Sequence, residues 1–207
     1  RRADIHRPSD RYRRKEKLLK NIRIKSVLID RTFSRKEPLL KRGLMEKQSL
    51  YFIGPGEVEV RKEETKPIGK DEVLVETDFF FIIFGTEMLF YKNQIDNDRL
   101  IDEELDDLKG NFEYPFKYGY SCVGKVREIG TEVTEEWMNR LVFSFHPHES
   151  TFVKSVDGLL PVPKGIDSLD ASFLPNLETA INIIMDGRPI IGENAIVIGQ
   201  GGVGPLT

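Results

Sequence analysis

Short apolar runs separated by glycine and proline turns dominate the chain from residue 45 to residue 166. Apolar and charged side chains alternate along 58–61, as they do in a half-exposed strand. Prolines at 161 and 163 exclude a helix from 159–163. Further strands are predicted at 49–53, 72–77, in the second half of 118–130, at 141–145 and at 151–154. This spacing of short strands predicts a small β-rich unit.

Helical periodicity begins only after this unit. Residues 168–173 and 178–185 are predicted helices, with Pro175 marking a break between them. A short apolar run at 195–198, predicted as a strand, then enters the pattern G-x-G-x-x-G at 199–204. Dinucleotide-binding folds use this turn to bring backbone against a pyrophosphate. The predicted fold class is therefore mixed β and α/β, a β-rich domain followed by the start of a Rossmann domain.

Composition narrows the class of protein. The chain has 207 residues, of which 39% are hydrophobic and 10% aromatic, enough for a packed core. Its single cysteine, Cys122, excludes an internal disulfide and a cysteine-rich zinc site, which fits a reducing compartment. The apolar run 79–84 is too short to span a bilayer, and no secretory signal begins the sequence. We expect a cytoplasmic location, no membrane partner, and a sequence open at both ends.

Charge divides the chain into unequal parts. Residues 1–44 carry sixteen Lys and Arg against five Asp and Glu, whereas the other 163 residues carry 15 basic and 29 acidic side chains. The basic extension 1–44, with a basic helix at 11–24, is either a nucleic-acid-binding arm or a solvated extension. We expect the second, and leave 1–44 unassigned. The acidic stretch 95–108 lacks the EF-hand pattern and is expected to be solvated.

Four short stretches in order resemble the medium-chain dehydrogenase/reductase superfamily of zinc-type alcohol dehydrogenases. They are 72–75 (EVLV), 118–126 (YGYSCVGKV), 141–143 (LVF) and 196–199 (IVIG). The second of them resembles the family's G-H-E-x-x-G-x-V strand. The resemblance covers about residues 47–207. It implies a GroES-like substrate domain over 45–166. Residues 167–207 would then form the connecting helices, followed by the first strand and the glycine turn of an incomplete Rossmann domain.

Three further stretches resemble the zinc-poor branch that includes bacteriochlorophyllide-type dehydrogenases. They are 84–91 (FGTEMLFY), 145–148 (FHPH) and 174–180 (LPNLETA). At the positions where zinc-containing members carry metal ligands, this chain has Phe84, Tyr120 with Ser121, and Pro175. Phe, Tyr and Pro are not usual zinc ligands, so no zinc is expected and no metal site is assigned. Hydrogen-bond donors would then have to polarise a substrate carbonyl.

The resemblance also suggests pocket residues. Thr86 matches the hydroxyl that passes on the alcohol proton in zinc members, with a local turn role as the equal alternative. Tyr120 could donate to a substrate oxygen or be a half-buried strand tyrosine. Glu178 and Thr179 begin a helix in the region that faces the cofactor in this family, where a carboxylate could orient a ligand or favour the helix N-terminus.

His146, His148 and Glu149 form a polar cluster after a predicted strand. Two imidazoles and a carboxylate could bind a metal, but Pro147 disturbs strand geometry and a third confirmed ligand is missing. We expect a place in the substrate pocket, where an imidazole would exchange the alcohol proton.

The leading hypothesis is a zinc-independent oxidoreductase that transfers hydride between NAD or NADP and an alcohol/carbonyl pair or an activated alkene. The cofactor-binding residues would be Gly199, Gly201, Gly202, Val203 and Gly204. The residue that selects NAD or NADP should lie about twenty residues after the turn, outside this sequence. The alternative is a non-catalytic truncated fragment or scaffold with a basic arm for nucleic acid. A small-molecule substrate is the expected partner; a homo-oligomer is compatible with the sequence, which does not define its state.

Overall fold

The structure is a computed structural model that describes residues 44–95 and 113–207, all within one unit of the chain. The predictions for the basic segment 1–43, with its helix at 11–24, and for the acidic stretch 96–108 lie outside the described residues.

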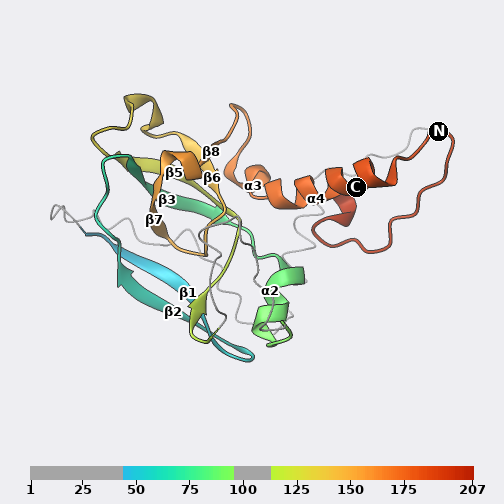
Figure 1. Cartoon of the computed structure of the whole chain (residues 1–207), viewed down its shortest axis with the longest axis horizontal. Helices are drawn as coiled ribbons and strands as arrows, with labels where there is room; N and C mark the ends of the chain where they lie inside the picture. Colours follow the sequence, from blue (N-terminus) through green and yellow to red (C-terminus); the bar gives the residue numbers. More distant parts are fainter. Residues whose placement is uncertain (1–43, 96–112) are drawn as a thin grey trace, which may run out of the picture. The chain divides into compact units, whose positions relative to one another are not determined.

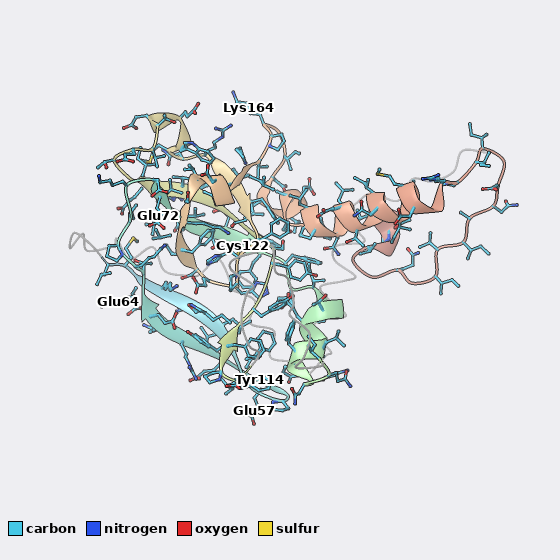
Figure 2. All side chains as sticks on the ribbon, in the orientation of Figure 1. Glu57, Glu64, Glu72, Tyr114, Cys122 and Lys164 are labelled. Carbon is cyan, nitrogen blue, oxygen red and sulfur yellow. The ribbon has the colours of Figure 1, made fainter. Side chains whose placement is uncertain are left out.

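A three-stranded antiparallel sheet has the order β2-β1-β4. Its strands are β1 (Glu46–Gly54), β2 (Glu57–Glu64) and β4 (Phe116–Lys117). β1 and β2 form a hairpin around Gly56, whose φ of 80° favours glycine. β2 is an edge strand with mostly exposed side chains, and Glu57 and Glu64 mark its two ends (Figure 2). Charged side chains on such an edge discourage pairing with another chain.

A second, five-stranded antiparallel sheet has the order β7-β3-β5-β6-β8. Its strands are β3 (Glu72–Phe80), β5 (Cys122–Ile129), β6 (Leu141–Ser144), β7 (Thr151–Ser155) and β8 (Leu160–Pro161). The consecutive residues Val73, Leu74 and Val75 of β3 are all buried, because both faces of this strand are covered. The two antiparallel sheets confirm the predicted β-rich unit.

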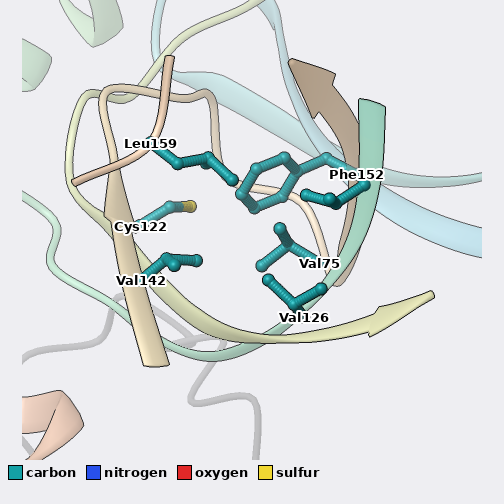
Figure 3. Packing of buried hydrophobic residues seen from close by; sticks show 7 residues of the cluster. Val75, Cys122, Val126, Val142, Phe152 and Leu159 are labelled. Atoms are coloured by element: carbon teal, nitrogen blue, oxygen red, sulfur yellow. The ribbon is translucent and has the colours of Figure 1, made fainter. Parts of the chain in front are cut away.

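The main hydrophobic core lies in the five-stranded sheet. Figure 3 shows Val75, Val126, Phe152 and Leu159 converging from different strands and loops on one volume. Cys122 belongs to the same cluster and has no exposed surface. Burial raises the pKa of its thiol to about 12, so the sulfur behaves as a small apolar group.

The helices are short except for the last. They are α2 (Phe84–Tyr91), which packs beside β1 (Figure 1), α3 (Ser168–Ala171) and α4 (Leu174–Gly187). Three 3₁₀ turns, η2 (Glu135–Trp137), η3 (Val156–Gly158) and η4 (Gly204–Leu206), complete the elements within 44–95 and 113–207. The two predicted helices are separate, but the break lies at 172–173 and not at Pro175, because α4 begins at Leu174 and includes this proline in its first turn. A proline is tolerated there since its missing N–H is not needed.

The strand predicted at 195–198 is also wrong: these residues have no regular secondary structure. Ile196 and Ile198 are 85% and 95% exposed. An apolar run becomes a buried parallel strand only beside neighbouring strands, and neither of the two sheets of the described residues pairs with this run. No helix within 44–95 or 113–207 is long and apolar enough to cross a membrane.

Candidate functional site

A pair of hydroxyl groups joins α2 to the segment that leads into β5. Thr86 Oγ1 lies 3.4 Å from Tyr120 Oη, and both side chains are half-buried. Burial and the nearby Glu87 carboxylate raise the pKa of Tyr120, outweighing the opposing hydrogen bond with Thr86. The phenol therefore keeps its proton at neutral pH and can donate a hydrogen bond to a substrate oxygen.

Directly beside Thr86, a buried carboxylate–imidazole pair fixes the start of α2. Glu87 Oε1 accepts a hydrogen bond of 2.8 Å from the Ile83 amide, so the side chain caps its own helix. His148 Nε2 lies 2.9 Å from Glu87 Oε2, and the His148 ring stacks on Phe80 at 4.5 Å. The His148 side chain has no exposed surface. The structure thus places His148 in the interior, where it holds Glu87.

Gly119 gives the His148 ring its place. A β-carbon at Gly119 would lie 2.8 Å from His148 Cε1 and 2.9 Å from both ring nitrogens. The backbone φ at this position is 138°, which disfavours any residue with a side chain. Glycine is therefore required at this position for two reasons, the backbone conformation and the close contact with the His148 ring.

A second polar cluster, the Glu149 network, surrounds one buried carboxylate. Glu149 is 3% exposed and accepts hydrogen bonds from Lys47 Nζ at 2.7 Å and Lys117 Nζ at 2.6 Å. His146 Nε2 lies at 3.1 Å and Ser49 Oγ at 3.1 Å from its oxygens. Burial alone would raise the pKa of Glu149, but His146 and the two lysines outweigh it and hold this pKa well below its usual range.

Glu63 extends the network to the hairpin. Its carboxylate accepts hydrogen bonds from Tyr51 Oη and, at 2.7 Å, from Ser49 Oγ. Burial opposes ionisation, but these two bonds and the lysines lower the pKa of Glu63. An open hollow of about 590 Å³ lies over the cluster; its lining includes Lys47, Glu63, Lys66, Lys117, His146 and Glu149. Cations and carboxylates balance along this lining, so it attracts neither anions nor cations strongly.

The Glu149 network joins the two sheets. Ser49 of β1 bridges to Glu149, and Thr77 of β3 donates to the Glu149 carbonyl at 2.6 Å. Lys47 lies on β1 and Lys117 on β4, so one carboxylate links two of the three strands of the smaller sheet to the loop before β7. The Glu149 network therefore has a structural role, which is to hold the two sheets together.

We expect the stability of the protein to fall in acid because of Glu149. A carboxylate with a lowered folded-state pKa adds stability that is present above its unfolded pKa of about 4.5 and is lost as pH falls below it. Between pH 4.5 and pH 3 the loss should reach about 2 kcal/mol for this group. Urea unfolding at pH 7, 4.5 and 3 measures it, and Glu149→Gln should show a correspondingly shallower decline. Parallel declines in both proteins would contradict the assignment.

The two predicted histidines do not act as one cluster. His146 bonds Glu149 and stacks on Phe152 at 4.0 Å, whereas His148 bonds Glu87 and stacks on Phe80. The loop between β6 and β7 turns their rings toward different partners. In the described part of the chain, no group of three or more His, Cys, Asp or Glu is arranged to hold a metal ion.

The structure places Glu178 and Thr179 on the exposed side of α4. The Thr179 hydroxyl donates to the Pro175 carbonyl at 2.9 Å, which is a bond within the helix. Neither side chain is brought together with Thr86 and Tyr120 by a hydrogen bond among the described residues.

The glycine turn is closely packed on itself. A β-carbon at Gly204 would lie 2.0 Å from the Gly199 carbonyl oxygen, and Gly199 has a φ of 104°. Gly201 is exposed, while Gly202 and Val203 are half-buried. These glycines fit a turn against which a pyrophosphate could pack. Only the 3₁₀ turn η4 follows, so the described residues supply the turn without the α-helix N-terminus that would hold the phosphates.

Sequence reasoning missed Glu87 and Asn176. Glu87 is 3% exposed, and its signal is a carboxylate placed four residues after Ile83 at a helix start. Asn176 is also 3% exposed and follows Pro175 within an apolar stretch, where a polar residue needs a reason.

Solved structures share this fold. The quinone oxidoreductase from Coxiella burnetii superposes with a TM-score of 0.54 at 18% identity, over 72% of this chain and 47% of that chain. A protein named CAD from Helicobacter pylori, solved with NADP(H), superposes with a TM-score of 0.60 at 13% identity. The match covers 79% of this chain and 55% of that chain. The human synaptic vesicle membrane protein VAT-1 homolog-like protein superposes with a TM-score of 0.53 at 16% identity. The match covers 70% of this chain and 45% of that chain.

These likenesses establish the fold. The predicted class, mixed β and α/β with a GroES-like β-rich domain, is confirmed by the sheets and by these structures. The chain spans about half the length of the solved proteins. No protein-family model and no curated protein sequence matches it. At these identities the zinc-poor branch stays a prediction.

Proposed function

We propose that this protein is a zinc-independent oxidoreductase that transfers hydride between NAD or NADP and an alcohol/carbonyl pair or an activated alkene. The observation that carries the proposal is the Thr86–Tyr120 hydroxyl pair, in a fold shared with a quinone oxidoreductase and an NADP(H)-bound protein. The nicotinamide would supply or accept the hydride. Tyr120 would donate a hydrogen bond to the substrate oxygen, and Thr86 would orient the phenol.

The buried pair behind these hydroxyls supports the proposal. Glu87 fixes the first turn of α2 through a half-buried hydrogen bond, and His148 holds Glu87 through a buried one, so the turn that carries Thr86 is held in place. Such preorganisation is what a donor needs if no metal ion polarises the carbonyl. In this scheme His148 is a positioning residue, while His146 belongs to the Glu149 network at the edge of the hollow.

The proposal is tested on the protein as its gene encodes it, with any residues on either side of these 207. NADH and NADPH are titrated first, and hydride transfer is then measured with aldehydes, ketones, quinones and enones. Activity should persist in the presence of a zinc chelator. Binding of neither nucleotide would reject the proposal and favour a scaffold, the alternative class. Loss of activity on chelation would reject zinc independence alone.

Tyr120→Phe should lower kcat by about 100-fold, with little change in KM, because a donor to the developing negative charge is lost. Thr86→Val should lower it by about 10-fold, since Tyr120 then loses only its orienting partner. The matched control is Tyr91→Phe, which removes a phenol hydroxyl from the other end of α2. Equal kcat for Tyr120→Phe and the control would show that the Tyr120 hydroxyl takes no part in the reaction.

A further inference from the structure

Asn176 is a buried polar side chain with an unused hydrogen-bonding atom. It is the third residue of α4 and is 3% exposed. Its Oδ1 has no hydrogen-bond partner among the described residues. Buried amide groups are nearly always paired, so a carboxamide in this state needs an explanation.

The carboxamide lies against the glycine turn. A β-carbon at Gly202 would be 2.5 Å from Asn176 Nδ2, 3.5 Å from its Cγ and 3.7 Å from Phe81 Cε1. Because Gly202 has no side chain, backbone of the turn lies directly over the amide. Phe81 in turn packs on Phe173, the residue before α4, at a ring-centroid distance of 4.7 Å. Asn176 is thus held at the place where the turn approaches the rest of the protein.

Stability does not explain an asparagine here. No side-chain hydrogen bond caps the start of α4, so Asn176 does not serve as a cap. A leucine at the same position would bury apolar surface, favour the helix more and leave no polar atom unpaired. A residue that lowers stability in this way is typical of a ligand contact.

We propose that the Asn176 carboxamide is a direct contact of the nucleotide at the glycine turn, accepting a hydrogen bond from one of its O–H or N–H groups. This inference rests on the proposed function and adds a residue to the same site. The donor is a ribose hydroxyl or the nicotinamide carboxamide, which share this chemistry. The contact depends on Gly202, because any side chain there would occupy the space of the amide.

Asn176→Leu should weaken NADH binding at least about 10-fold, measured by fluorescence titration, because a hydrogen bond to the ligand is lost. The urea midpoint of the unliganded variant should equal or exceed that of the natural protein. Asn182→Leu is the matched control, since Asn182 is an exposed asparagine on the same helix, and it should leave NADH affinity unchanged. Asn176→Ala repeats the test with a smaller side chain if the leucine variant does not fold.

The reduced acetylpyridine analogue of NADH, which lacks the carboxamide N–H, identifies the donor. Weak binding of this analogue to the natural protein assigns the carboxamide, and binding equal to that of NADH assigns the ribose. Unchanged NADH affinity in the Asn176 variants, or a loss of stability without a loss of affinity, would overturn the inference and leave the proposed function standing. Absence of NADH and NADPH binding by the natural protein would reject both.

Discussion

Glu149→Gln is expected to lower the free energy of unfolding by about 3 kcal/mol at pH 7. The substitution keeps the shape of the side chain but removes the negative charge that Lys47 and Lys117 share. The Lys47 side chain is only 13% exposed, so water cannot replace the lost partner fully. Because the network links both sheets, the loss should appear as cooperative unfolding at lower urea. Circular dichroism during urea titration measures it.

The matched control for this prediction is Glu132→Gln. Glu132 pairs with Lys70 at 3.5 Å, but the two side chains are 63% and 77% exposed. Exposed pairs contribute less than about 1 kcal/mol, so this variant should unfold almost like the natural protein. If both substitutions had equally small effects, the Glu149 network would not be the connection between the sheets.

Gly119→Ala is the second substitution with a large expected effect, about 2–4 kcal/mol of lost stability. A side chain at a φ of 138° is strained, and the new methyl group would press on the His148 ring. The ring would have to move away from Glu87, so activity should fall together with stability. Thermal unfolding and turnover by the same preparation measure the two losses.

Gly56→Ala separates the two causes. Its φ of 80° gives the same kind of backbone strain, but nothing lies within 4 Å of a β-carbon there. It should therefore lose only about 1 kcal/mol and keep full activity. Equal losses for Gly56→Ala and Gly119→Ala would show that the contact with His148 has no energetic weight.

The strands could be predicted from the sequence because each carries its own signal. Alternation at 58–61 and apolar runs at 72–77 and 151–154 coincide with β2, β3 and β7. α2 was missed, because an eight-residue helix has little periodicity and depends on Glu87, whose partner His148 is 61 positions away. The run 195–198 has the pattern of a strand, but a pattern cannot supply neighbours to pair with.

The candidate site was predictable only in part. Thr86 and Tyr120 were selected singly from resemblance, and their closeness became visible only in the structure, since they are 34 positions apart. The Glu149 network was out of reach for the same reason: Lys47 and Glu149 are 102 positions apart. His146 and His148 were expected in the substrate pocket, with Pro147 already arguing against regular strand geometry, and the loop turns the two rings to different carboxylates. Spacing determines a shared face only within regular elements.

The single cysteine has a practical consequence. Cys122, the first residue of the central strand β5, is an enclosed, protonated thiol in the main hydrophobic core. A thiol reagent can reach it only during the rare moments when β5 and its neighbours separate. The rate of thiol modification therefore reports on the opening of this sheet. The protein needs no engineered label for a measurement of its native-state fluctuations.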